Sequence, residues 1–154
     1  MSRPDTGRGP VGLLAALALV MALCVGCAQA PGGPVGELVT STESARSGVL
    51  TAMRALSEWH DNRLPSRVTA VTVDDALSST YDAVGVVVAL DVESARDDER
   101  RIDVQQRLSR AVDSIVRARR VLNGGRDEPV VRAAIDDLGR VGAELDGLAE
   151  RMSS

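Results

Sequence analysis

The chain has 154 residues, of which 44% are hydrophobic and 26% are charged. This length suits one domain, and the composition is typical of a globular chain rather than a disordered one. Eighteen basic and 22 acidic residues give a net charge of −4, and every basic residue is Arg. A net-acidic chain with one Trp, one Tyr and no Phe is poorly suited to bind phosphates or to stack on bases. We therefore expect no nucleic-acid partner.

The first 26 residues have the organisation of a secretory signal peptide. A polar segment with Arg3 and Arg8 precedes an uncharged, mostly apolar run from Val11 to Gly26. A charged segment followed by a short apolar segment is typical of such signals. The run is shorter than the about 20 residues that a spanning helix needs. An uncleaved membrane anchor remains the alternative.

Two cleavage sites compete after the apolar run. The sequence CVGC at residues 24–27 resembles the lipobox of bacterial lipoproteins, in which a small residue directly precedes a cysteine. It departs from the family pattern at Cys24, where lipoboxes have leucine, and Leu23 stands one place earlier. The resemblance implies cleavage before Cys27, diacylation of its sulfur through a thioether, and a lipid anchor at the outer face of the cell membrane. The alternative is ordinary secretory cleavage after Ala30, at the end of an A-x-A triplet.

The lipoprotein interpretation divides the chain into three parts. Removal of residues 1–26 takes away two Arg and one Asp, which leaves 128 residues and a net charge of −5. Residues 27–36 contain the cysteine and a Pro/Gly-rich stretch, and we expect them to form a tether. Residues 37–154 contain periodic apolar segments and are predicted to form the folded domain. Because both cysteines precede this domain, we expect no disulfide within it.

Residues 37–63 are predicted to form the first helix. Thr40–Glu43 has the form of a capping box, although the apolar pattern also permits a start at Val35. Asn62 and Pro65 are predicted to end the helix. Apolar residues recur at intervals of three and four positions on one face, namely Leu38, Ala45, Val49, Ala52, Met53, Leu56 and Trp59.

Residues 66–90 are predicted to form the second helix. The segments 67–73 and 84–90 are rich in β-branched residues, which also suit strands. Residues 68–73 are therefore left open between helical and extended structure. The helical interpretation places one stripe of residues toward the core, namely Ala70, Val73, Leu77, Tyr81, Val84 and Val88.

The third helix is predicted over residues 95–122, after a turn near Val92–Ala95. Ser94 and Asp97 have the spacing of a helix cap and the first turn that follows it. One long bent helix that joins this segment to the second is the alternative. The expected core stripe has strict 4-3-4-3-4 spacing and consists of Val104, Leu108, Ala111, Ile115, Ala118 and Leu122.

The outer face of residues 95–122 carries alternating charges. Acid-first pairs four positions apart favour a helix, and the sequence offers Asp97 with Arg101, Asp103 with Arg107, and Asp113 with Arg117. Arg117, Arg119 and Arg120 gather near the C-terminal end, where cations complement the helix dipole. These arginines suit either a solvated face or contact with anionic lipid or cell-wall polymer, and the interspersed acids favour the solvated face.

The fourth helix follows the clearest stop signal in the chain. Asn123–Gly125 is predicted to end the third helix, and Asp127–Pro129 to begin the fourth. Its glycines, at positions 139, 142 and 147, either allow close packing or are merely tolerated. The expected stripe is Val131, Ala134, Leu138, Val141, Leu145, Leu148 and Met152. Four helices with short connections predict an all-α fold, an antiparallel up-down four-helix bundle.

Few residues suggest chemistry. His60 and Asp61 are adjacent, so their side chains point in different directions on a helix, and no nucleophile accompanies them. The acidic pairs lack the ligand alternation of a calcium loop, and those at 74–75 and 97–98 are better explained as the first turns of helices. The pairs are Asp74/Asp75, Asp97/Asp98 and Asp136/Asp137. We expect no catalytic residue, no metal site and no cofactor.

Two non-enzymatic functions follow. The first is an interaction or structural module that meets an envelope protein at the membrane surface, with the outer face of the third helix, around Arg107 and Arg110, as the expected contact. The second is a sensor or carrier that binds a small apolar ligand between its helices. A cavity lined by Val84, Val88 and Leu108 would favour the carrier, whereas a closed core with an exposed apolar or charged strip would favour the interaction module.

Overall fold

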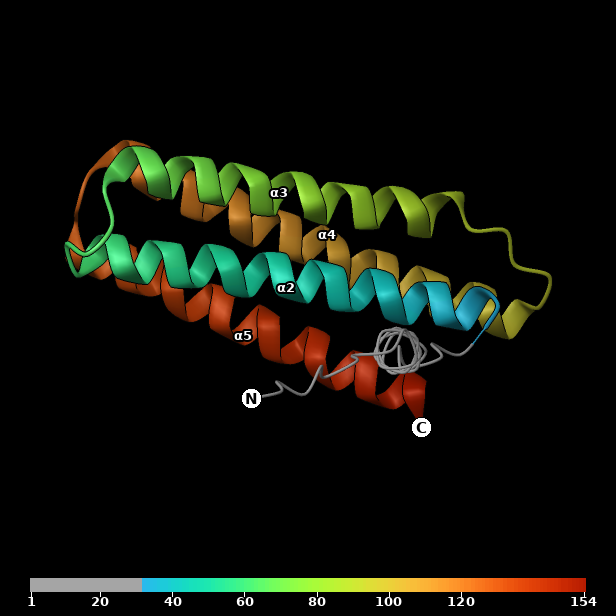
Figure 1. Ribbon diagram of the computed structural model, residues 1–154. Helices are drawn as coiled ribbons and strands as arrows, with labels where there is room; N and C mark the ends of the chain where they lie inside the picture. Colours follow the sequence, from blue (N-terminus) through green and yellow to red (C-terminus); the bar gives the residue numbers. More distant parts are fainter. Residues whose placement is uncertain (1–31) are drawn as a thin grey trace, which may run out of the picture.

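The computed structural model describes residues 32–154, which form four helices and no strand. The helices are α2 (Pro34–His60), α3 (Ser66–Ala89), α4 (Ala95–Gly124) and α5 (Glu128–Ser153). Successive helices lie side by side and run in opposite directions (Figure 1). The predicted all-α, antiparallel up-down four-helix bundle is confirmed. None of the helices in this part of the chain is long and apolar enough to span a bilayer.

The four helices do not share the core equally. Helices α2 and α4 each contact all three other helices, whereas α3 and α5 do not contact each other. In Figure 1, α3 and α5 accordingly lie on opposite sides of the pair formed by α2 and α4. Each of these two outer helices therefore buries one side and leaves a broad side toward solvent.

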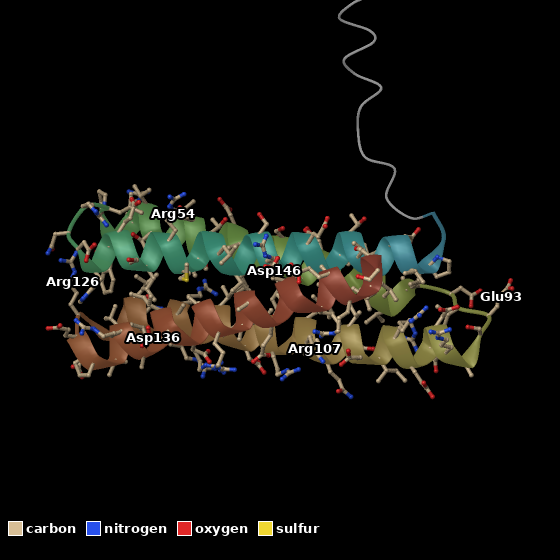
Figure 2. The ribbon with its side chains drawn as sticks, turned by 90° about the horizontal axis from the view of Figure 1, so that it is seen from below. Arg54, Glu93, Arg107, Arg126, Asp136 and Asp146 are labelled. Atoms are coloured by element: carbon tan, nitrogen blue, oxygen red, sulfur yellow. The ribbon has the colours of Figure 1, made fainter. Side chains whose placement is uncertain are left out.

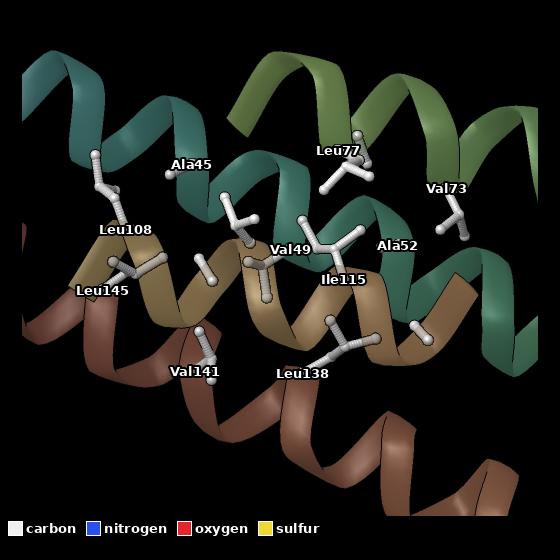
Figure 3. Close-up of a cluster of buried hydrophobic side chains, with 14 of the residues drawn as sticks. Ala45, Val49, Ala52, Val73, Leu77, Leu108, Ile115, Leu138, Val141 and Leu145 are labelled. Carbon is white, nitrogen blue, oxygen red and sulfur yellow. The ribbon is translucent and has the colours of Figure 1, made fainter. Parts of the chain in front are cut away.

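Apart from Trp59, the core consists of aliphatic side chains from all four helices, among them Val49, Ile115 and Leu138 (Figure 3). The stripes predicted for the first, third and fourth helices are confirmed, since nearly all of their residues are buried. The exceptions are Met53, Leu122 and Met152, which are partly buried against the core. These stripes were predictable because each helix has only one apolar face.

Helix α2 begins earlier than predicted. Pro34 lies in its first turn, where a missing N–H is tolerated, and Gly33 precedes it with a φ of 87°. Residues 34–36, which composition assigned to the tether, therefore form the first turn. The prediction of a capping box at Thr40–Glu43 was wrong, because Thr40 lies inside the helix. The Thr40 hydroxyl donates a hydrogen bond to the Gly36 carbonyl at 3.0 Å.

Two alternatives that the sequence left open concern the start of α3 and the connection between α3 and α4. Helix α3 starts at Ser66, so residues 68–73 are helical rather than extended. Residues 90–94 are not helical, which excludes one long bent helix. As predicted, Ser94 caps α4, and its hydroxyl oxygen accepts a hydrogen bond from the Asp97 backbone N–H at 3.1 Å.

The last connection also follows the sequence signals. Helix α4 extends to Gly124, two residues beyond its predicted end, and Gly125 adopts a φ of 101°, in the region that favours glycine. Helix α5 begins at Glu128 with Pro129 in its first turn. Close packing is seen at Gly142, where a Cβ atom would lie 3.0 Å from Leu50 Cδ2 of α2.

Candidate interaction surface on helix α3

The buried face of α3 differs from the predicted one. Tyr81 and Val88 were expected in the core, but each is 53% exposed. Ala70 and Val84 are only partly buried. Val73 and Leu77 are buried as predicted. The other residues that face the core were not in the predicted stripe, namely Thr69, Ala76, Thr80, Ala83 and Val87.

Helices α2 and α3 approach each other closely at Gly48, opposite Ala76 and Thr80 on the inward side of α3. A Cβ atom at Gly48 would lie 2.6 Å from Thr80 Oγ1 and 3.0 Å from the Ala76 carbonyl oxygen. Only small side chains fit along this contact. The Thr80 hydroxyl donates to the Ala76 carbonyl at 2.8 Å, and Thr69 does the same to Pro65 at 3.1 Å. These hydrogen bonds allow both threonines to be buried without unsatisfied hydroxyl groups.

Large apolar side chains also lie on the solvent side of α3. Its exposed large apolar residues are Val68, Val71, Tyr81, Val86 and Val88. Elsewhere in residues 32–154, only Ile102 and Val130 are large apolar residues with comparable exposure. A helix that packs on one side normally carries polar residues on the other, so α3 is the exception in this bundle.

A second regular stripe runs along the solvent side of α3. Its residues are spaced alternately three and four positions apart, as in a helix–helix contact, and all are exposed. We call this stripe the outer seam, and it consists of Val68, Val71, Asp75, Ser78, Asp82, Gly85 and Ala89. The seam begins with two valines and ends with two residues that have little or no side chain, Gly85 and Ala89. The two carboxylates lie between these ends.

The carboxylates of the outer seam have no partner among the described residues. Asp75 and Asp82 form no ion pair there. The neighbouring Asp74 differs, because it lies 2.8 Å from the guanidinium of Arg119 on α4. The only basic residue of α3 is Arg67, near the opposite end from Asp82. The outer seam therefore combines two exposed valines at its start with two carboxylates that are unpaired within the described residues.

A groove of about 370 Å³ adjoins the outer seam between α2 and α3. Gly36 and Ala83 line the groove with little side-chain bulk, and Val86 contributes an apolar side chain to its lining. Glu37 and Asp82 add two carboxylates to its lining. Its size and lining suit an apolar side chain that is accompanied by a cation.

The α4–α5 side of the bundle has a different surface, which carries many charged side chains (Figure 2). Several of them form ion pairs between the two helices or within α5. Asp137 of α5 accepts hydrogen bonds from the Ser114 hydroxyl at 2.7 Å and from Arg117 and Arg140. Burial alone raises the pKa of Asp137, but the hydrogen bonds from Arg117 and Ser114 and the charges of both arginines outweigh it. The pKa of Asp137 is therefore held below its usual value.

The predicted ion pairs within α4 are confirmed only in part. Asp103 and Arg107 pair at 2.9 Å as expected. The other two predictions were wrong, because Arg101 pairs with Asp98 and Arg117 reaches across to α5. Arg101 pairs with the carboxylate three positions away on its own helix, whereas Arg117 pairs with a carboxylate of the neighbouring helix, which the spacing rule does not consider.

The acidic pairs occupy three different positions. Asp97 and Asp98 lie in the first turn of α4, as predicted. The hydrogen bond from the Ser94 hydroxyl is the main cause that lowers the pKa of Asp97. Asp74 and Asp75 lie inside α3, so their assignment to a first turn was wrong. No group of three residues with metal-binding side chains occurs in the described part of the chain.

The end of the bundle near His60 is closed by Trp59. The Trp59 ring is 2% exposed, its Nε1 donates to Ser66 Oγ at 2.8 Å, and the Arg126 guanidinium lies 4.8 Å from the ring centre. Asp61 pairs with Arg63 at 2.7 Å. The sequence indicated Trp59 as a core residue, but its partners come from other elements and were not predictable from spacing.

The remaining site residues are not brought together. Leu108 is completely buried, whereas Val88 projects into solvent. They therefore do not line the shared cavity with Val84 that the carrier hypothesis requires. Cys27 and the alternative cleavage site after Ala30 lie outside the described residues. No protein family, curated protein or solved structure matches the chain.

Proposed function

We propose that the protein is a non-enzymatic lipoprotein, anchored through Cys27 at the outer face of the cell membrane, whose helical bundle binds an envelope protein. The observation that carries this proposal is the apolar, negatively charged outer side of α3. Exposed apolar side chains that gather on one face commonly mark a protein-binding surface. The closed core and the exposed strip are the features that favoured an interaction module over a carrier.

The position of the bundle relative to the anchor supports this role. Six residues lie between Cys27 and Pro34, where α2 begins. Even when fully extended, a segment of this length reaches about 25 Å. The bundle is thereby held close to proteins of the same membrane, and such tethering raises their effective concentration. A surface of modest affinity is then sufficient for binding.

The surroundings of His60 support binding rather than catalysis. His60 is the last residue of α2 and is partly exposed. A general base of the His–Asp type needs a carboxylate that orients the imidazole and a nucleophile beside it. Asp61 is instead paired with Arg63.

The anchor is tested by metabolic labelling of bacteria with an alkyne fatty acid. Wild-type protein is expected to incorporate the label and to partition into detergent. Cys27→Ser is expected to lose the label and to leave an uncleaved or released product. Cys24→Ser is the matched control and retains the label. Unchanged labelling and processing of Cys27→Ser contradict the proposed anchor.

The mode of action is tested with His60→Ala and Asp61→Ala in the full-length protein. Both variants are expected to reverse the phenotype of a deletion strain as well as the wild type does, because neither residue belongs to the α3 surface. Circular dichroism and detergent partitioning check that the fold and the anchor persist. If His60→Ala abolishes the phenotype while both persist, the binding-module proposal is wrong.

A further inference from the structure

The outer seam of α3 has the spacing and shape of a surface that receives another helix. Its alternating steps of three and four residues place seven side chains in a row along about 30 Å of α3. Ser78, Gly85 and Ala89 have little or no side-chain bulk, which permits close approach of a second backbone. A Cβ atom placed at Gly85 would meet nothing within 4 Å. The seam is thus open to solvent and unobstructed.

The charges of the seam identify the complement. Asp75 and Asp82 lie seven residues apart, which is about 10.5 Å, or two helical turns. A facing helix with Arg or Lys at two positions seven residues apart matches both carboxylates. Apolar side chains of the same helix face Val68 and Val71 at one end and Val86 at the other. One large apolar side chain of that helix fits the groove beside Val86, next to the carboxylate of Glu37.

A second copy of this chain is a poor occupant. In an antiparallel pair centred on Ser78, Asp75 of one copy lies near Asp82 of the other, and in a parallel pair each carboxylate meets itself. Like charges that face each other at an interface are unfavourable. Residues 32–154 also carry a net charge of −5, from 16 basic and 21 acidic residues, which adds long-range repulsion.

A membrane surface is also a poor occupant. Helices that lie in lipid head groups carry Lys and Arg on their polar side, where these residues meet phosphate. The solvent side of α3 instead carries Asp75 and Asp82, and Arg67 is its only cation. The carboxylates oppose contact with anionic lipid.

We infer that the outer seam of α3 is the docking surface for one amphipathic helix of a partner protein, which presents apolar side chains together with two or more basic residues. This inference specifies the partner of the proposed interaction module and rests on that proposal. The helix lies along α3 and inserts an apolar side chain into the groove between α2 and α3.

The test is photo-crosslinking of the full-length, membrane-anchored protein in the cells that make it. A benzophenone amino acid replaces Val71 or Ser78 on the seam, and Ile102 on α4 or Ala143 on α5 as controls. The seam positions are expected to yield one protein adduct, whose cross-linked peptide is an amphipathic helix with basic residues. The control positions are expected to yield at least about tenfold less of this adduct.

Two further variants test how the seam is used. Gly85→Leu adds bulk at an open position, so it is expected to reduce the adduct at least about tenfold without lowering the thermal midpoint. Ala143→Leu is the matched control and leaves the adduct unchanged. Asp82→Arg is expected to reduce the adduct to a similar degree, whereas Asp136→Arg, at an exposed acid on α5, is expected to preserve it.

Each other outcome overturns the inference. Adducts from the seam to a second copy, to lipid or to a peptide without basic residues show a different occupant. An adduct that survives Gly85→Leu and Asp82→Arg shows that the seam is not the contact. Adducts only from Ile102 or Ala143 refute the seam but leave the proposed interaction module intact. No adduct from any of the four positions contradicts the proposed function as well.

Discussion

At the scale of single residues, Gly48 determines how closely α2 and α3 approach. Its missing side chain leaves room for Thr80 and for the backbone at Ala76, which lie where a Cβ atom would meet them. The contact places Ala76 and Thr80 on the interior side of α3, together with larger residues such as Leu77. Tyr81 and four valines, at positions 68, 71, 86 and 88, lie on the exposed side, so one glycine inside the bundle contributes to the chemistry of its exterior.

Two glycine-to-alanine substitutions test this interpretation. Gly48→Ala is expected to lower the free energy of unfolding by about 1–2 kcal/mol, because the clash with Thr80 and Ala76 exceeds the gain in helix propensity. Gly85→Ala, at an open helical position, is expected to raise it by about 0.5–1 kcal/mol. Urea denaturation followed by circular dichroism measures both. Equal stability of the two variants contradicts a close contact at Gly48.

At the scale of helices, the sequence predicts those with one apolar face better than those with two. Helix α5 has a single stripe, and residues such as Leu138 and Leu145 are buried as expected. Helix α3 offers apolar residues on both sides, and Tyr81 and Val88 were assigned inward because they continue the spacing of Val73 and Leu77. Which side is buried depends on the shape of α2, and this information is not in the α3 sequence alone.

The pairing of Arg117 with Asp137 illustrates the same limit for charges. The rule for positions four apart correctly gave Asp103 with Arg107, which share one helix face. It could not give Asp137, because this residue lies 20 positions away and is brought near only when α4 and α5 pack. The repeated spacing of the outer seam was visible in the sequence, but its exposure required the structure.

The contact between α4 and α5 is expected to depend on pH through Asp137. The pKa of Asp137 is lowered in the folded protein. The stabilisation by Asp137 is therefore complete above the ordinary Asp pKa of about 4, and it is lost as the pH falls through the lowered pKa of the folded state. Asp137→Asn is expected to cost about 1–2 kcal/mol at pH 7. The difference from wild type should shrink below about pH 4.

Urea titrations between pH 3 and pH 7, at steps of about one unit, measure this dependence. Asp136→Asn is the control, since this exposed neighbour forms no ion pair among the described residues. A change of less than about 0.5 kcal/mol is expected for it at every pH. A constant difference between Asp137→Asn and wild type across the range contradicts an ionised Asp137 as the cause.

At the scale of the whole molecule, the helical architecture is open to a direct measurement. Circular dichroism of residues 28–154 is expected to be dominated by helix, because the four helices occupy most of the described chain. The valine-rich segments of α3 are the part most prone to strand structure by propensity. A sheet content above about a fifth, the ordinary share in globular proteins, contradicts the bundle.

The bundle presents two unlike sides to its surroundings. On the α4–α5 side, cations and carboxylates largely satisfy one another, as in the contacts of Arg110 and Arg140 with Glu144. On the α3 side, Asp75 and Asp82 form no ion pair among the described residues, and each lies one helical turn from an exposed valine, Val71 and Val86 respectively. Paired surface charges contribute little to association, whereas unpaired charges beside apolar groups both attract and select a partner. The outer face of α4 around Arg107 and Arg110, expected from sequence to be the contact, is therefore the weaker candidate.

Net charge and local charge make different predictions for partner binding. The double variant Asp75→Arg/Asp82→Arg changes the net charge by +4, and so does Asp113→Arg/Asp136→Arg on α4 and α5. If attraction depends only on net charge, both weaken binding equally. Because the seam carboxylates are expected to contact the partner directly, we expect a loss of about tenfold or more for the first variant and about twofold or less for the second.

The variant Arg107→Glu/Arg110→Glu completes this comparison, because it makes the molecule more negative and disrupts the contacts with Asp103 and Glu144. Quantitative cross-linking from Ser78, at ionic strengths of about 50 and 300 mM, measures all three variants. The α4 variant is expected to bind the partner about as well as wild type, and any gain from its added charge should disappear at the higher ionic strength. A loss as large as that of the seam variant would show that α4, and not α3, faces the partner.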